Sequence, residues 1–336
     1  MKYPFSSITR YAGRVLSLIL VLVLQLTLNA QKKSPILHEE LARKEDSLKW
    51  FADSMINAVE APDRFRADSN FVRSFVRALK YKGSFNYPFD SLLTISKLYP
   101  ADSSFRIFTW QLKKDEYTYL QKGAIQVHTD DGSLKLFPLF DYSMFTAKPY
   151  DSVRTPENWI GSIYYRLIEK SFRGKKYYTL LGFDDFSVSS NKKWIEVLHF
   201  NDKKEPVFGG PYFSYKDDTT KKGVQSRFLM EYKKEANTVL NYDPELDMIV
   251  YDHLVSETEE PEKKNTYIPD GTYEGFKWSN GQWLHVDKVF NFALKDGQFP
   301  VDEQLRDAQG NIDENKLEEA SQRNMEKAKK KSKIKN

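Results

Sequence analysis

The sequence predicts an α+β protein that is predominantly antiparallel β, a sandwich or barrel-like fold preceded by an N-terminal three-helix segment. Apolar residues recur at helical spacing between residues 36 and 99. From Ser104 onward the pattern changes to short runs rich in Tyr, Phe, Trp, Val and Ile, separated by polar turns. Helices of crossover length do not alternate with these runs, which disfavours parallel βαβ units. A small β-propeller is the alternative, because hairpins recur at a spacing of about forty residues.

Residues 1–30 have the layout of a secretory signal peptide. Three basic residues and no acid accompany an apolar run from Val15 to Leu28, and Ala30 is a small residue at a candidate cleavage site. The alternative is an uncleaved anchor over residues 12–30 in the inner membrane. The charge-free stretch ending at Gln31 has seventeen residues, fewer than the roughly twenty of a spanning helix. In both cases the positive end stays inside, so we expect the remainder in the periplasm or cell envelope.

Residues 31–100 form the predicted helical segment. Pro in Ala61-Pro62-Asp63 ends the first helix and can open the second. The second helix ends at Lys82-Gly83-Ser84, and Tyr99-Pro100 closes a third, shorter helix. The apolar stripes are Leu37, Leu41, Leu48, Phe51, Met55 and Val59 for the first helix, Phe71, Val72, Phe75, Val76 and Leu79 for the second, and Phe89, Leu92, Leu93, Ile95 and Leu98 for the third.

Residues 101–300 form the predicted antiparallel β domain. Asn280-Gly281 joins two aromatic strands and is the strongest hairpin signal, because both central residues of a type I′ turn need positive φ. The predicted strands cover residues 105–112, 117–121, 124–128, 133–139, 160–170, 176–183, 193–200, 207–215, 225–234, 236–242, 246–253, 272–278 and 282–290.

Composition excludes several classes of protein. The 336-residue chain has no cysteine, which excludes disulfide scaffolds, thiol catalysis and acylation at a lipoprotein cysteine. Removing residues 1–30 would delete three basic residues from the 51 and none of the 47 acidic ones, so the net charge falls from +4 to +1. Six lysines lie in the last ten residues of a charged helical or disordered tail, 301–336. The body is therefore slightly acidic, and we predict no nucleic-acid partner.

The sequence carries no recognised metal or cofactor motif, so we predict neither a metal site nor a cofactor. The chain has five histidines but no HExxH, no P-loop, no GxGxxG and no GxSxG. Glu196 and His199 are three residues apart, but on a strand this odd spacing points them to opposite faces.

Four residues are candidates for a catalytic role. Asp184 and Asp185 follow a predicted strand as a carboxylate pair, and paired carboxylates can cleave glycosides when they face each other. Neighbouring Asp residues at a turn more often cap local N–H groups. Asp252 and His253 offer an acid and a base, although adjacent residues of a strand diverge.

One row of side chains on the last hairpin is a candidate for ligand binding. Trp283, His285 and Asp287 alternate along a predicted strand and share one face. Such a row could bind a sugar or position a proton, or it could be an ordinary solvent-exposed face with a cross-strand partner.

Five blocks of the strand region carry a resemblance to known proteins: Phe105–Trp110, Tyr178–Phe183, Trp194–Leu198, Tyr251–Leu254 and Pro269–Phe276. Together they resemble a family of uncharacterised exported proteins of the Bacteroidetes type, over roughly residues 85–290. The leader ending in Asn29-Ala30-Gln31 is similar to the leaders of that group. The resemblance implies export and an envelope location, and it assigns no activity or catalytic residue.

The sequence favours a non-enzymatic envelope module that binds a protein or glycan or has a structural role. One alternative is a hydrolase acting on envelope glycans or peptides through the acids and histidines above. Another is a membrane-anchored assembly factor, which requires an uncleaved leader. Membrane contact is expected only through that leader.

Overall fold

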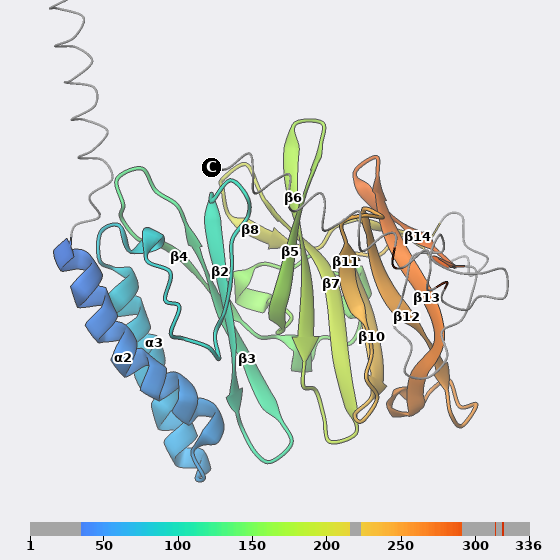
Figure 1. Ribbon diagram of the computed structural model, residues 1–336, viewed down its shortest axis with the longest axis horizontal. Coiled ribbons are helices and arrows are strands. Elements are labelled where there is room, and N and C mark those ends of the chain that lie inside the picture. Colours follow the sequence, from blue (N-terminus) through green and yellow to red (C-terminus); the bar gives the residue numbers. More distant parts are fainter. Residues whose placement is uncertain (1–34, 216–222, 291–312, 314–317, 319–336) are drawn as a thin grey trace, which may run out of the picture. The chain divides into compact units, whose positions relative to one another are not determined.

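The computed structural model describes residues 35–215 and 223–290, together with residues 313 and 318. The chain divides into two compact units (Figure 1). Among the described residues, the first unit contains 35–94 and the turn 128–135, and the second contains 95–127, 136–215 and 223–290. The predicted leader (1–30) and nearly all of the predicted tail (301–336) lie outside the described residues and stay predictions.

Two helices dominate the first unit. Helix α2 spans Pro35–Asn57 and α3 spans Ala61–Leu79, with Pro62 in its first turn as predicted. The Arg64 guanidinium joins them, because its Nη1 donates to the carbonyls of Ala58 at 2.8 Å and Val59 at 2.7 Å just after α2 ends. The predicted apolar stripe of the first helix extends past the helix itself, since Val59 lies two residues beyond Asn57 and is exposed.

The predicted third helix is wrong. Residues 89–95 form turns, a 3-10 turn covers Ser84–Asn86, and Ser96–Leu98 is strand β1. Phe89 has φ +57°, which a right-handed helix does not accommodate. The buried Glu45 carboxylate of α2 accepts the backbone N–H of Ser91 at 2.6 Å and the Tyr87 hydroxyl. This tertiary contact fixes the irregular chain. Phe89, Leu92 and Ile95 are buried there without being helical, whereas Leu93 is exposed.

The described strands of the second unit form three sheets. Most neighbouring strands are antiparallel, and the pairing of residues 213–214 with 283–284 is parallel. The first sheet has the order β1 (Ser96–Leu98), β2 (Phe105–Lys113), β3 (Tyr119–Val127) and β4 (Lys135–Phe140). The second has the order β10 (Arg227–Lys233), β7 (Ser190–Phe200), β6 (Lys175–Asp184) and β5 (Ile163–Phe172), with β8 (Pro206–Phe208) on β7. The third has the order β11 (Leu240–Asp243), β12 (Met248–Ser256), β13 (Tyr267–Ser279), β14 (Gln282–Val286) and β9 (Phe213–Ser214).

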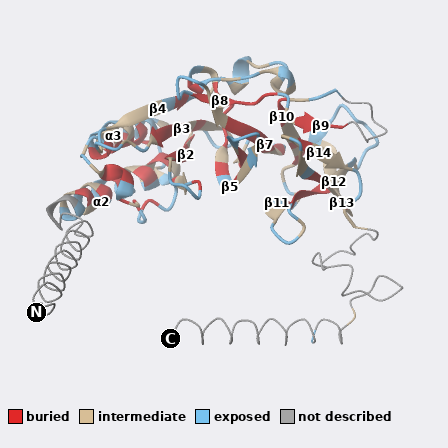
Figure 2. Ribbon diagram, turned by 90° about the horizontal axis from the view of Figure 1, so that it is seen from above, coloured by how far each residue is buried: buried red, intermediate tan, exposed pale blue. Residues whose placement is uncertain are grey.

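The second sheet is buried on both faces. Leu180 and Leu198 belong to a core cluster with Phe105 of the first sheet. Leu181 and Ile195, on the opposite face, pack in a cluster with residues of the third sheet. The continuous run of buried residues in β7 is visible in Figure 2 and is typical of strands that are covered on both sides.

The described residues therefore confirm an α+β fold that is mostly antiparallel β, and none of the three described sheets closes into a barrel. The described strands form three sheets, which is fewer than the roughly four or more blades of a typical propeller. They therefore do not form the propeller that is the alternative prediction. The predicted type I′ turn is confirmed, because Asn280 and Gly281 have φ of +51° and +82° between paired β13 and β14.

A buried ion pair fixes the middle sheet to the segment that precedes it. Arg227 of β10 is fully buried, and its Nε lies 3.2 Å from Glu196 Oε2 on β7. Its Nη1 donates to the carbonyl of Ser152 at 2.8 Å and to that of Pro149. Tyr164 donates its hydroxyl to the other oxygen of Glu196. These contacts position the 3-10 turn Pro149–Asp151 on β10.

Removing one partner of this ion pair should strongly destabilise the second unit. We expect Arg227→Met to lower the free energy of unfolding by about 3–5 kcal/mol, because the Glu196 carboxylate stays buried without its cation. The Arg227→Met/Glu196→Leu double variant should lose much less than the single variants combined. Urea unfolding followed by tryptophan fluorescence measures this.

An exposed ion pair on the same strand supplies the matched control. Lys233 pairs with Glu257 at 2.7 Å, with both side chains more than a third exposed, so Lys233→Met should change stability little. Equal losses for Arg227→Met and Lys233→Met would contradict the assignment.

Candidate functional site

A cavity of about 310 Å³ in the second unit combines aromatic walls with ionisable groups. It lies where β10, β12, β13 and the 3-10 turn Lys264–Thr266 come together. Its lining comprises Tyr150, Phe228, Leu229, Met230, Glu231, Tyr251, Asp252, His253, Leu254, Lys264, Tyr267 and Glu274. Apolar walls with a few convergent polar groups are typical of small-ligand sites.

Glu274 is the centre of the polar groups. The β12–β13 register pairs Tyr251 with Glu274, so their side chains share a face. The Tyr251 hydroxyl donates to Glu274 Oε2 at 2.8 Å, and His285 Nε2 lies 3.0 Å from the same oxygen. On the other side, His253 Nε2 lies 3.7 Å from Glu274 Oε1, and its Nδ1 lies 2.8 Å from Asp270 Oδ2. The result is a row of alternating acids and histidines.

A β-bulge helps to form this row. The pairing of β12 with β13 shifts between Asp252 and Leu254, and His253 is the residue at the shift. Bulges redirect side chains next to functional sites. Strand alternation places His253 on the same face as Tyr251, and the extra residues 270–272 of β13 at the bulge bring Asp270 within 2.8 Å of it.

The environment of Glu274 keeps its carboxyl ionised. Burial by itself raises the pKa of Glu274, but hydrogen bonds from His285 and Tyr251 and the proximity of His285 and His253 outweigh it. The pKa of Glu274 therefore lies below its ordinary value. At neutral pH this carboxylate is a fixed hydrogen-bond acceptor.

Aromatic side chains line the same cavity as Glu274. Phe228 packs on Tyr251 with 4.5 Å between ring centroids. Lys264 holds Tyr267 in place, since its Nζ lies 4.3 Å from the ring centroid and donates to the Tyr267 hydroxyl at 3.1 Å. These contacts restrain Tyr251 and Tyr267, two of the aromatic side chains in the cavity wall.

Only part of the predicted catalytic set reaches this cavity. Asp252 and His253 both line it and diverge as predicted, because the Asp252 carboxylate accepts the N–H of Val239 while His253 turns toward Glu274. Burial, the largest cause, raises the pKa of Asp252 to about 6, against the hydrogen bond from Val239.

Asp184 and Asp185 lie elsewhere and do not face each other. The buried Asp184 accepts from Gln121 Nε2 at 2.9 Å on the first sheet. Asp185 forms an ion pair with Lys234. Glu196 and His199 also diverge as predicted, since Glu196 bonds Tyr164 while His199 Nδ1 lies 3.4 Å from the Tyr212 hydroxyl.

The predicted binding row is not an open surface. Trp283 is fully buried and donates through Nε1 to Thr179 Oγ1 at 2.9 Å. His285 is buried against Glu274, and only Asp287 is exposed. Trp283 therefore belongs to the core, while His285 contacts two residues that line the cavity, Tyr251 and Glu274.

Glu274 itself was missed by sequence reasoning. It is the acid of Tyr273-Glu274-Gly275 within an aromatic strand. An isolated carboxylate in such a run is a signal, but its partners come from β12 and β14, so the register is needed to find them.

A second cavity of the same unit is larger, about 430 Å³, and also has aromatic walls. Tyr177 and Tyr212 line it, with 5.5 Å between their ring centroids. Burial, and to a smaller extent Lys175, lowers the pKa of His199 there. Its lining residues do not include a row like that of Glu274.

Within the described ranges, no group of three or more His, Asp or Glu side chains is arranged to hold a metal ion. In the same part of the chain, no helix has the length and apolar character needed to cross a membrane. Comparisons with protein-family models, curated proteins and solved structures find no match to this chain.

The buried carboxyl of Asp184 predicts a pH-dependent stability. Burial raises its pKa from 3.8 to about 6, despite the hydrogen bond from Gln121 and the charge of Lys192. The folded state holds this proton more tightly than the unfolded chain, so the contribution of Asp184 to stability falls as the pH rises from about 4 to 6. The gain in unfolding free energy from Asp184→Asn should therefore grow by about 2–3 kcal/mol between about pH 4 and pH 7.

Urea unfolding at the two pH values measures this growth. Asp185→Asn is the control at the adjacent position, where loss of the ion pair with Lys234 should leave stability unchanged or lower at pH 7. A gain for Asp184→Asn that is the same at both pH values would contradict the buried-carboxyl assignment.

Proposed function

We propose that the protein is a non-enzymatic binding module of the cell envelope whose cavity around Glu274 takes a sugar ring. The observation that carries the proposal is the Glu274 carboxylate, held by Tyr251 and His285 next to the aromatic walls. A sugar offers hydroxyl donors around its edge and an apolar C–H face. The Glu274 carboxylate accepts hydrogen bonds from the sugar hydroxyls, and the Tyr rings contact the apolar C–H face.

Preorganisation strengthens this proposal. The Glu274 oxygen is oriented by two neighbours, and Tyr267 is held by Lys264 and by the Pro261 carbonyl, to which its hydroxyl donates at 3.2 Å. A ligand therefore loses little free energy to ordering the site. The envelope location rests on the leader and on the family resemblance.

A hydrolase of glycans or peptides is the alternative, and the meeting of His253 with Glu274 favours it. Glycosidases need an acid with a raised pKa opposite a second carboxylate. Glu274 has a lowered pKa. Asp252, with a raised pKa, is engaged by Val239, and Glu231 accepts from the Ser190 hydroxyl at 2.8 Å. The binding module fits these residues better.

A membrane-anchored assembly factor would require the uncleaved segment 12–30, outside the described residues. Mass spectrometry of the mature N-terminus distinguishes this anchored form from a chain whose leader has been cleaved. A chain that starts at Met1 would contradict the cleaved-leader prediction.

Sugar binding is testable by saturation-transfer NMR with the purified mature chain. The probes are N-acetylglucosamine, galactose, mannose and glucuronic acid, and we expect transfer to the ring C–H protons of at least one. Glu274→Gln should weaken binding of that sugar about tenfold, which corresponds to loss of a charge-assisted hydrogen bond of about 1.4 kcal/mol. Tyr267→Ala should weaken it similarly, and Tyr267→Phe should retain most of the affinity.

Tyr212→Ala in the second cavity is the matched control and should bind the sugar as the unaltered chain does. Absence of transfer from all four sugars would overturn the proposal. Loss of sugar binding in Tyr212→Ala but not in Tyr267→Ala would show that the sugar binds in the second cavity and not beside Glu274.

A protein partner is the second candidate, favoured by the loop that follows β4. Its large apolar side chains are exposed although Asp141 fixes its backbone, accepting the N–H groups of Ser143 and Gly161, each at 2.9 Å. Large exposed apolar patches mark interaction sites. The exposed side chains are Phe140, Tyr142, Met144, Phe145 and Val153.

The partner candidate predicts that the mature chain enriches a specific protein from the native envelope. Met144→Ser/Phe145→Ser should lose this enrichment, because it removes the two most exposed apolar side chains of the loop. Leu93→Ser, at an equally exposed apolar position in the first unit, should retain it. Enrichment that survives the loop substitutions would contradict this role.

A further inference from the structure

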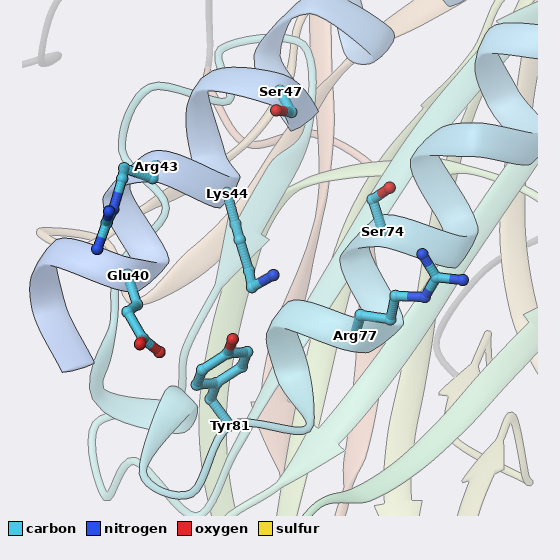
Figure 3. Close-up of a pocket in the computed structure, with 7 residues that line it drawn as sticks. All are labelled: Glu40, Arg43, Lys44, Ser47, Ser74, Arg77 and Tyr81. Carbon is cyan, nitrogen blue, oxygen red and sulfur yellow. The ribbon is translucent and has the colours of Figure 1, made fainter. Parts of the chain in front are cut away.

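The first unit contains a groove between its two helices, separate from the cavities of the sheets. Its volume is about 400 Å³. Figure 3 shows side chains from α2 and α3 on its two sides, with Tyr81 at one end. The lining residues are Glu40, Arg43, Lys44, Ser47, Ser74, Arg77 and Tyr81.

The lining is rich in hydrogen-bond donors. It contains three cations and three hydroxyl groups but a single carboxylate, Glu40. This excess of positive charge contrasts with the slightly acidic body of the chain. The groove is therefore chemically complementary to a ligand that carries negatively charged acceptors.

Two of the cations have no acidic partner among the residues that the structure describes. Lys44 and Arg77 have no carboxylate oxygen within 4.0 Å there, whereas Arg43 has a long contact of 3.8 Å with Glu39. Lys44 Nζ instead lies 5.2 Å from the centroid of the Tyr81 ring. This contact holds the ammonium inside the groove and leaves its N–H donors available.

Helix electrostatics explain only part of this arrangement. Arg77 lies in the last turn of α3, where a cation interacts favourably with the helix dipole. Lys44 lies in the interior of α2, and the dipole does not favour a cation there. Lys44 from α2 and Arg77 from α3 line the same groove, so both charges would attract an anion bound there.

We propose that the α2–α3 groove binds a phosphate or sulfate group, with Lys44 and Arg77 as its principal ligands. Arg presents a planar fork that suits such oxyanions, and Lys adds a point charge. Ser47 and Ser74 supply further donors from the two helices. The groove volume falls in the range of small-molecule sites, so the anion is expected to be carried by a small organic group.

Chemical protection of Lys44 tests the site on the full mature chain. The lysines are acetylated with an N-hydroxysuccinimide ester, with and without inorganic pyrophosphate, and mass spectrometry gives the rate at each lysine. With pyrophosphate at about ten times its dissociation constant, acetylation of Lys44 should slow about tenfold. Lys49, an exposed residue of the same helix, should keep its rate.

Substitutions distinguish binding in the groove from nonspecific attraction of an anion to the positive charges of the helices. Arg77→Gln should abolish the protection of Lys44, whereas Arg73→Gln should retain it, because the exposed Arg73 on α3 donates to Asn70 and is not among the residues that line the groove. Both are surface changes, and circular dichroism verifies that the helices persist. Equal protection of Lys44 and Lys49 would overturn the proposal, because it would show general charge attraction and not binding in the groove.

A third arm identifies the source of the anion. Vesicles of phosphatidylcholine with and without phosphatidylglycerol replace pyrophosphate. Protection of Lys44 by the anionic vesicles, lost in Arg77→Gln, would support a lipid headgroup as the carrier. Protection by pyrophosphate alone would support a soluble phosphorylated ligand. Failure of both probes would contradict the site.

Discussion

Burial of the second sheet on both faces is the constraint on which the second unit depends. A sheet covered on both sides leaves its polar side chains without water, so each needs a partner. Glu196 meets this requirement through Arg227 and Tyr164, and Arg227 in turn holds the carbonyls of Pro149 and Ser152. One buried ion pair thus links β7, β10 and the preceding 3-10 turn.

The same constraint shapes the candidate site. Tyr150 lies in that 3-10 turn, and it lines the cavity together with residues of β10. On the opposite wall, the register of β12 and β13 and a bulge at His253 bring two histidines and Tyr251 to Glu274. The cavity is therefore a product of strand pairing, since its polar groups come from three strands.

In the first unit, too, a buried carboxylate with its hydrogen-bond donors determines part of the fold. Two amphipathic helices pack along apolar stripes, and the polar face between them holds Lys44 and Arg77. The buried Glu45 then holds residues 87–91 by hydrogen bonds in place of a third helix. A carboxylate that is buried with two donors outweighs the helical preference of a short apolar stripe.

The sequence by itself determined the two long helices, most strands, the Asn280-Gly281 turn and the divergence of Glu196 from His199, because spacing and turn chemistry are local. It could not separate buried from open aromatic faces, so it offered Trp283 as a binding residue although the side chain is fully buried. It also missed Glu274. Only the tertiary structure decided which sheets cover one another, which turns join which unit, and which carboxylate meets two histidines, because these depend on register and on contacts between residues far apart in the chain.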